Sequence, residues 1–131
     1  MQLLHTMIRV DSLDASKRFY VEGLGMRVLR EKEYPDGRFT LCFIGYGDES
    51  ANAVIELTHN WDPGTYAHGN RFGHLAIGAR NIEALAARAE RFGGRITRPT
   101  GPMKFGGSVI AFVEDPDGIA IELIESAEPT G

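Results

Sequence analysis

The stretch Leu4-His-Thr-Met-Ile-Arg-Val10 returns later in the chain as Gly73-His-Leu-Ala-Ile-Gly-Ala79, with the two histidines 69 positions apart. The tripeptide Ile-Glu-Leu also occurs twice, at 55–57 and at 121–123, which are 66 positions apart. One connection that is shorter in the second half accounts for the different spacing. Similar stretches in the same order predict an internal repeat of one supersecondary unit.

A helix is expected after the first strand of each half. Asp11-Ser-Leu-Asp14 has the polar and acidic residues of a helix start, and Gly23 and Gly25 end the segment. In the second half Asn81 opens the helix, apolar residues follow at helical spacing, and Gly93-Gly94 stop it. Each half therefore begins with a strand and a helix.

Three further strands, separated by turn residues, are expected in each half. In the first half they cover about 26–33, 38–46 and 53–59, and Pro35-Asp-Gly37 forms a turn. In the second half they cover about 95–98, 107–113 and 119–125, and Asp115-Pro-Asp-Gly118 forms a tight turn. The predicted fold class is α+β, with two tandem βαβββ modules.

The length of 131 residues suits one domain, which we expect to span 1–131. Module 1 is expected at about 1–60, a linker rich in turn residues at about 60–70, and module 2 at about 71–126. A half of about 65 residues buries only about 60% of its unfolded surface. We therefore expect the halves to pack together or against another copy of the chain.

The composition excludes several classes of function. The 14 Lys and Arg against 18 Asp and Glu give a net charge of -4 without a basic block, which argues against nucleic acid binding. Cys42 is the only cysteine, so an intramolecular disulfide and a cysteine zinc finger are excluded. The chain shows neither a signal-peptide pattern nor about 18 consecutive apolar residues. We expect a cytoplasmic protein without a membrane segment.

Two glutamates interrupt apolar strands at the same place in the repeat. Glu56 lies in Ala53-Val-Ile-Glu-Leu57, and Glu122 lies in Ile119-Ala-Ile-Glu-Leu-Ile124. A single glutamate in such a strand more often faces the solvent side of a half-covered sheet. A buried carboxylate, however, has to be paired or bind a metal. The repetition favours the second interpretation.

Two histidines show the same symmetry. His5 and His74 occupy the same early position in the first strand of their modules, whereas His59 and His68 have no counterpart in the repeat and are expected on the surface. A single strand histidine is more often a hydrogen-bonded core residue than a ligand. The case for a site therefore depends on the repeat.

These two imidazoles and two carboxylates would place two nitrogen and two oxygen donors around one point. An octahedral ion with two open positions, such as nickel, cobalt, zinc or manganese, suits that donor set. Structural zinc prefers a closed site, often with cysteine. The pattern therefore predicts a catalytic metal.

Period-two spacing extends the candidate site. His5 and Arg9 share one face of a strand, and Glu56, Thr58 and Asn60 share one face of another. A guanidinium and an amide beside a metal suit a ligand with carboxylate and peptide groups. An ordinary surface salt bridge is the alternative for Arg9.

A glycine-bearing segment, Thr100-Gly-Pro-Met-Lys-Phe-Gly-Gly107, is long enough to form a mobile flap. Arg98 and Lys104 belong to this region and are candidates for substrate binding. An exposed charged loop is the simpler explanation of both.

The chain resembles the bacterial glyoxalase I (lactoylglutathione lyase) family of the vicinal-oxygen-chelate superfamily over roughly residues 2–126. The motifs that carry the resemblance are Leu3-Leu-His-Thr-Met-Ile-Arg-Val10, Gly73-His-Leu-Ala-Ile77, Ala53-Val-Ile-Glu-Leu-Thr-His-Asn-Trp61, Ala111-Phe-Val-Glu-Asp-Pro-Asp-Gly118 and Ile121-Glu-Leu-Ile124. The resemblance implies that one metal is bound by His5, Glu56, His74 and Glu122. It also implies that Arg9 and Asn60 help to hold the glutathione part of the substrate.

The reaction implied by the resemblance is isomerisation of the methylglyoxal–glutathione hemithioacetal to S-lactoylglutathione, which detoxifies methylglyoxal. Proton transfer through a metal-stabilised enediolate is expected, with Glu122 as the base and Glu56 assisting. Short bacterial members usually prefer nickel or cobalt over zinc, so nickel is expected here. The resemblance further implies a homodimer in which His5 and Glu56 of one chain meet His74 and Glu122 of the other.

One position departs from longer zinc-type relatives, which carry an arginine four residues before the second histidine ligand. This chain has Asn70 there and Arg71 next to it, so the residues that bind the glycyl carboxylate stay open. Two alternative functions also stay open. One is another enzyme of the superfamily, a coenzyme A thioester epimerase or a metal-dependent thiol transferase, and the other is a metal-free drug-sequestering module.

Overall fold

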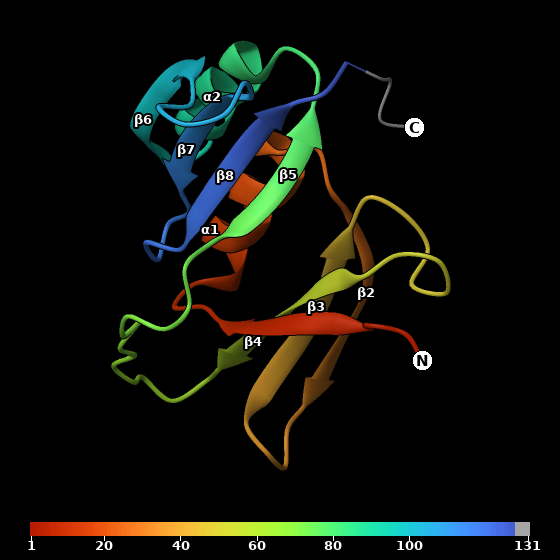
Figure 1. Cartoon of the computed structure of the whole chain (residues 1–131). Helices are drawn as coiled ribbons and strands as arrows, with labels where there is room; N and C mark the ends of the chain where they lie inside the picture. The colour runs from red at the N-terminus through yellow and green to blue at the C-terminus, as the bar shows by residue number, and fades with distance from the viewer. Residues whose placement is uncertain (128–131) are drawn as a thin grey trace. The chain divides into compact units, whose positions relative to one another are not determined.

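The computed structural model describes residues 1–127 of the chain. It contains two compact units, Met1–Ala67 and His68–Gly131. Figure 1 shows the chain coloured from one terminus to the other, with each unit built around its own four-stranded sheet. No helix among the described residues is both long enough and apolar enough to cross a membrane.

The first unit contains one sheet and one helical segment. Its elements are β1 (His5–Arg9), α1 (Leu13–Lys17), the π-helical η1 (Arg18–Gly23), β2 (Arg27–Tyr34), β3 (Phe39–Gly45) and β4 (Val54–Asn60). The strand order is β1-β4-β3-β2. Strand β1 is parallel to β4, whereas the β4–β3 and β3–β2 pairs are antiparallel.

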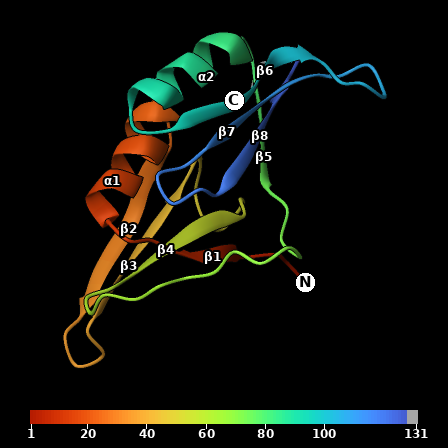
Figure 2. The same ribbon diagram turned by 90° about the vertical axis from the view of Figure 1, so that its left-hand side faces the viewer.

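The second unit repeats this arrangement. Its elements are β5 (Leu75–Ala79), α2 (Ile82–Arg91), β6 (Arg95–Pro102), β7 (Val109–Glu114) and β8 (Ala120–Glu125), and the strand order is β5-β8-β7-β6. Helix α2 packs along β6, β7 and β8, as Figure 2 shows from the side. The predicted α+β class with two βαβββ modules is confirmed.

The helical segment of the first unit starts as expected and then widens. The Ser12 hydroxyl accepts a hydrogen bond from the Ala15 N–H at 3.2 Å, which is a regular N-cap. The segment continues as a π-helix, which the sequence pattern did not indicate, and its residues Phe19 and Tyr20 are both fully buried. It ends at Gly23, and Gly25, two residues later, has a φ of 77°, in the left-handed region that glycine adopts without strain.

Helix α2 begins at the expected place but is capped by a different residue. Asn81 precedes it with a left-handed backbone, φ 56°, and its side chain makes no capping hydrogen bond. Instead the Glu125 carboxylate accepts from the N–H groups of Asn81 at 2.8 Å and Ile82 at 3.0 Å. An anion at a helix N-terminus satisfies free N–H groups and complements the helix dipole.

Strand β6 is longer than the predicted 95–98. Its pairing with β7 shifts register twice, between Ile96 and Arg98 and between Arg98 and Gly101. Pro99 and Pro102 have no N–H to donate to the ladder. The Arg98 guanidinium donates instead to carbonyl oxygens of this hairpin, so the strand continues past the prolines.

The buried side chains come mainly from the predicted apolar positions. In the first unit they include Val10, Phe19, Tyr20, Ile44 and Leu57, and in the second Ile82, Ala89, Val113, Ile121 and Leu123. Cys42 is also fully buried, and burial raises the pKa of its thiol to about 11. A thiol in this state is a poor nucleophile at neutral pH.

Candidate active site

The first unit brings His5 and Glu56 together. Strand β1 runs parallel to β4 with His5 opposite Val54, so Glu56, two residues further on, faces the same side of the sheet. His5 Nε2 lies 2.8 Å from Glu56 Oε2. The Glu56 side chain is only 14% exposed and that of His5 is 35% exposed. The carboxylate is therefore largely covered and lies within hydrogen-bond distance of the imidazole.

The second unit brings His74 and Glu122 together in the same way. His74 directly precedes β5, and Leu75 lies opposite Ile121 in the β5–β8 ladder. The residue opposite His74 is therefore the one before Ile121, and Glu122 lies two residues further along β8. His74 Nε2 lies 3.3 Å from Glu122 Oε1. The side chains are 41% and 15% exposed. The two pairs thus occupy equivalent places in the two sheets.

Each of these histidines also meets a phenylalanine. The ring of His5 lies edge-to-face with Phe43, with centroids 5.4 Å apart and planes at 86°, and His74 lies against Phe112 at 5.3 Å and 83°. Phe43 is opposite Glu56 in its ladder, as Phe112 is opposite Glu122. Sequence reasoning missed both phenylalanines, although they are 69 positions apart like the two histidines.

The donor chemistry of the pairs fits a divalent metal. In each pair the histidine Nε2 points at a carboxylate oxygen, so one nitrogen and one oxygen donor converge. Within the described part of each unit, no third His, Cys, Asp or Glu joins the pair. Imidazole nitrogen and carboxylate oxygen are both donors that divalent transition metals accept.

Arg9 and Asn60 lie further along the same strands. Arg9 is exposed and opposite Thr58, on the face that carries His5 and Glu56. Asn60 ends β4, and its Nδ2 donates to the Tyr66 hydroxyl at 3.0 Å. A pocket of about 220 Å³ opens at these strand ends and is lined by Val10, Asp11, His59, Asn60, Trp61, Asp62, Pro63, Gly64 and Tyr66. The first unit thus has polar groups on the strands that carry its His–Glu pair and a concave surface at the far ends of those strands.

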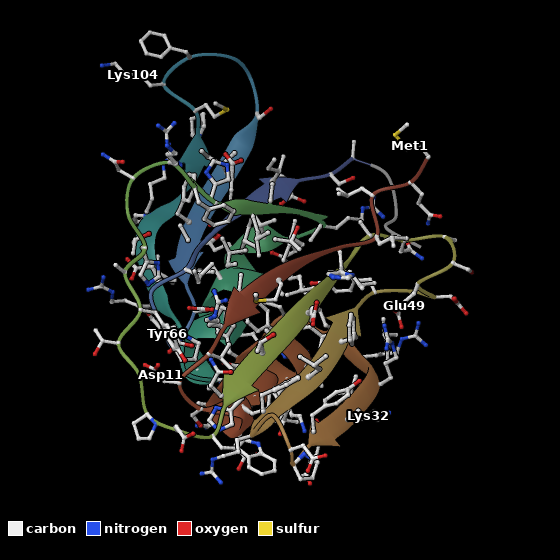
Figure 3. All side chains as sticks on the ribbon, turned by 90° about the horizontal axis from the view of Figure 1, so that it is seen from below. Met1, Asp11, Lys32, Glu49, Tyr66 and Lys104 are labelled. Atoms are coloured by element: carbon white, nitrogen blue, oxygen red, sulfur yellow. The ribbon has the colours of Figure 1, made fainter. Side chains whose placement is uncertain are left out.

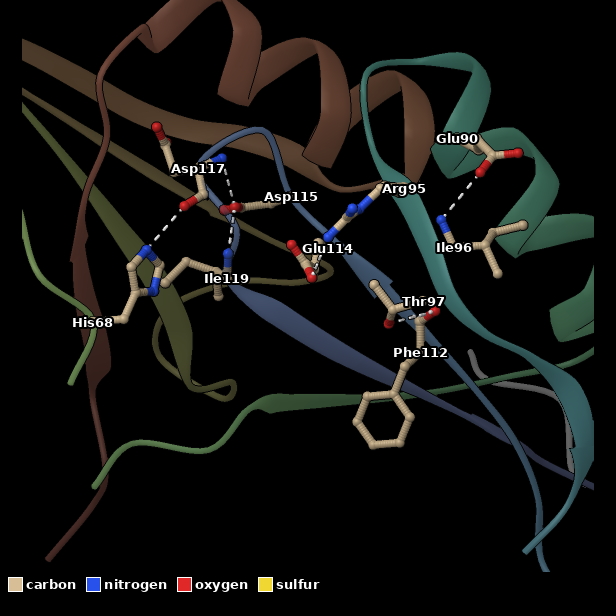
Figure 4. Close-up of polar contacts among 10 residues, drawn as sticks. All are labelled: His68, Glu90, Arg95, Ile96, Thr97, Phe112, Glu114, Asp115, Asp117 and Ile119. Carbon is tan, nitrogen blue, oxygen red and sulfur yellow. Dashed lines mark hydrogen bonds and ion pairs between the residues drawn. The ribbon is translucent and has the colours of Figure 1, made fainter. Parts of the chain in front are cut away.

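The other two histidines bind backbone oxygens. His59 is half-buried, with Nδ1 3.4 Å from the Val10 carbonyl oxygen, whereas His68 is exposed, with Nε2 2.9 Å from that of Asp117. Figure 4 shows His68 beside the turn in which the Asp115 carboxylate accepts from the N–H groups of Asp117 and Ile119. These contacts are separate from the two His–Glu pairs.

Arg98 and Lys104 have different surroundings. Arg98 Nη1 donates to the carbonyl oxygens of Pro99, Gly101 and Ile110 at 3.1, 2.9 and 3.0 Å, and its Nη2 donates to that of Pro102 at 2.7 Å. Lys104 lies at the tip of the β6–β7 connection (Figure 3), with its ammonium over the ring of Phe105, which is 76% exposed. Arg98 thus has a structural role in the hairpin, and Lys104 belongs to an exposed loop.

Comparison with known proteins connects this geometry with one family. A profile of the Glyoxalase/Bleomycin resistance protein/Dioxygenase superfamily matches residues 2–123. A probable lactoylglutathione lyase of Synechocystis is 58% identical, over 97% of both chains. The lactoylglutathione lyase of Neisseria meningitidis serogroup A is 54% identical, over 95% of this chain and 91% of that one.

A solved structure agrees. The crystal structure of glyoxalase I from Zea mays superimposes with a TM-score of 0.92 at 42% identity and covers 97% of this chain. The chain spans 45% of the length of the maize protein, which is less than half. The chain therefore belongs to the glyoxalase superfamily and, within it, to the lactoylglutathione lyase (glyoxalase I) family.

Proposed function

We propose that this enzyme converts the hemithioacetal of methylglyoxal and glutathione into S-lactoylglutathione by moving a proton between two neighbouring carbons. The observation that carries the proposal is the equivalent His–Glu pair in each unit. Relatives named lactoylglutathione lyase at 49–58% identity support this reaction over that of an epimerase, a thiol transferase or a drug-sequestering module.

The proposed metal ligands are His5, Glu56, His74 and Glu122. Family membership implies a divalent ion, and we propose nickel, with cobalt as the second choice and zinc as a weaker one. When bound, such an ion supplies Lewis acidity to the two adjacent oxygens of the hemithioacetal. We further propose a homodimer in which the His5–Glu56 pair of one chain meets the His74–Glu122 pair of the other. The location in the cytoplasm stays a prediction.

The proton transfer is assigned to the two carboxylates. Glu122 takes the proton from C1 of the substrate and returns it to C2, and Glu56 assists from the other pair. Both side chains are about six-sevenths buried. A carboxylate that is shielded from water interacts more strongly with a nearby proton or charge than an exposed one does.

The glutathione part of the substrate is assigned to the first unit. The Arg9 guanidinium binds a carboxylate of glutathione, and the Asn60 amide binds one of its polar groups. The Asn60 amide is already turned toward Tyr66 at the rim of the pocket. A substrate-binding role of Arg98 and Lys104 stays a prediction, and Arg98 would have to release backbone carbonyls to take it.

The test is an assay of S-lactoylglutathione formation, in which the thioester is detected by its ultraviolet absorbance. The purified protein should be inactive after chelation and should regain most of its activity with nickel or cobalt but little with zinc. Reactivation by zinc to an equal or higher level would reject the metal preference. Absence of turnover with every one of these ions would reject the proposed reaction.

A further inference from the structure

An arginine covers the phenylalanine beside His5. Arg30 lies opposite Phe43 in the β2–β3 ladder, directly after a bulge between Val28 and Arg30. Its guanidinium carbon is 3.6 Å from the centroid of the Phe43 ring, which is within the range of a stacked cation–π contact. The cation therefore lies over the same ring that meets the His5 imidazole at an interplanar angle of 86°.

The Glu49 carboxylate binds the same guanidinium through two hydrogen bonds. Arg30 Nε and Nη2 donate to Glu49 Oε2 and Oε1 at 2.8 and 3.1 Å, which is a bidentate pair. Glu49 comes from the β3–β4 connection and is labelled in Figure 3. Bidentate geometry restricts the plane of the guanidinium as well as its position. Glu49 thus anchors Arg30 over the ring.

The second unit provides an internal comparison. Arg98 lies opposite Phe112, also directly after a bulge, so it is the counterpart of Arg30. Its guanidinium is turned to the hairpin carbonyls rather than to the ring. Phe43 is accordingly only 4% exposed, whereas Phe112 is partly exposed. The His–Glu distance is also shorter where the ring is covered, 2.8 Å against 3.3 Å.

We propose that Arg30, anchored by Glu49, is a positioning residue for His5, acting through the ring of Phe43. The covered ring has little freedom to move, and its perpendicular contact with the imidazole restricts the rotation of the imidazole. His5 Nε2 is then held toward Glu56 before any ligand binds. The importance of this for catalysis rests on the proposed function, in which His5 is a metal ligand.

The first experiment observes the imidazoles without metal or substrate. The 131-residue chain, with labelled histidine, is compared by NMR with Arg30→Ala at one fixed pH, and the four ring signals are assigned by single substitutions. The Arg30 variant should shift or broaden the His5 signal and leave that of His74 in place. Lys32→Ala is the matched control, because Lys32 is a cation on the same strand that lies over Tyr34 instead. It should change neither signal.

The second experiment measures metal release and turnover. Cobalt should leave Arg30→Ala about 2- to 10-fold faster than it leaves the wild-type protein when a chelator is added. The kcat should fall by a similar factor while KM stays within about twofold, because the variant disturbs a ligand and not a substrate contact. Arg30→Lys, which keeps a cation over the ring, should recover part of both effects.

Two outcomes would overturn the inference. One is an unchanged His5 signal in Arg30→Ala, and the other is an equal change in the His74 signal, which would indicate general destabilisation. Where Arg30→Ala does not fold, Glu49→Gln removes the anchor without leaving a cavity and should still shift the His5 signal. If the wild-type protein binds no cobalt, the proposed metal function fails, and the metal-free NMR comparison still decides the positioning role.

Discussion

The two units share a ladder but differ in what surrounds it. Each has a parallel pair of strands at one edge of its sheet and a histidine in or directly before the edge strand. A glutamate lies on the neighbouring strand, two residues beyond the position opposite that histidine, and a phenylalanine lies opposite the glutamate. In the first unit the arginine after the bulge covers the ring, whereas in the second it binds carbonyl oxygens. The repeat therefore keeps the histidine and the glutamate at equivalent positions, whereas the contacts of the neighbouring arginine differ between the two units.

The comparison shows that His–Glu pairs at equivalent places can have different surroundings. The first unit has the covered ring, Arg9 and the pocket at Asn60, all of which favour holding a ligand in a fixed place. The second unit has a partly exposed ring and a glycine-rich loop with exposed Phe105. With the roles proposed for Arg9, Asn60 and Glu122, the first unit is expected to contribute more to substrate binding and the second more to the proton transfer.

The largest effect is expected from the carboxylates. Glu122→Gln should lower kcat by about 10²- to 10⁴-fold, because an amide still offers an oxygen donor but cannot accept the proton. Glu56→Gln should lower kcat less. Both are measured as S-lactoylglutathione formation, with metal content determined on the same samples.

The ratio of these two losses tests the proposed division. An equal or larger loss in Glu56→Gln, with metal still bound, would assign the base to the first unit. Near-normal turnover of metal-loaded Glu122→Gln would remove Glu122 from the proton transfer altogether. Glu114→Gln is a suitable control, since the Glu114 carboxylate accepts a hydrogen bond from Arg95 rather than contacting a histidine.

Mixing two inactive variants tests where the pairs meet. His5→Ala and His74→Ala are unfolded reversibly together and refolded as one sample. If the pairs come from different chains of a dimer, a heterodimer has one site with both lesions and one with none. Random pairing makes half of the dimers mixed, so about one quarter of wild-type activity should return. A single-chain site would keep one lesion in every combination, and no activity would reappear.

Arg9→Ala should raise KM for the hemithioacetal about 10-fold and change kcat less, because a substrate-holding contact acts in the ground state and the transition state alike. Arg98→Ala in the second unit should instead lower the free energy of unfolding, since its guanidinium serves four backbone carbonyls. The steady-state constants and urea unfolding curves of both variants give the comparison. A kcat loss at unchanged KM would place Arg9 in the chemistry.

The topology and the two His–Glu pairs were predictable because both depend on local patterns that occur twice. Alternating apolar residues mark strands, glycines mark the helix ends, and a glutamate in an apolar strand stands out when it recurs. The parallel pairing of β1 with β4 then brings His5 to Glu56. Gathering all four ligands in one site remains a prediction.

The features that were missed depend on contacts that are distant in sequence. Phe43 and Phe112 look like ordinary core residues of apolar strands, and only the ladder register places them opposite the glutamates. The cap of α2 comes from Glu125, 44 residues from Asn81, which no local capping motif includes. The length of β6 depends on a side chain, that of Arg98, which supplies hydrogen bonds that proline cannot.

The smallest effects are expected at the two helix starts, where free N–H groups are capped by Ser12 in the first unit and by Glu125 in the second. Glu125→Ala should lower the free energy of unfolding by about 1–2 kcal/mol, because it removes an anionic acceptor from two N–H groups. Ser12→Ala removes one neutral acceptor and should cost about 1 kcal/mol or less. The side chain of Asn81 makes no cap, so Asn81→Ala should lower the free energy of unfolding by no more than about 0.5 kcal/mol beyond the cost of placing alanine in a left-handed backbone. Asn81→Gly removes that backbone cost, because glycine adopts the left-handed conformation without strain. Urea unfolding of all four variants ranks them. A loss in Asn81→Gly as large as that in Glu125→Ala would show that the asparagine side chain caps the helix in solution after all.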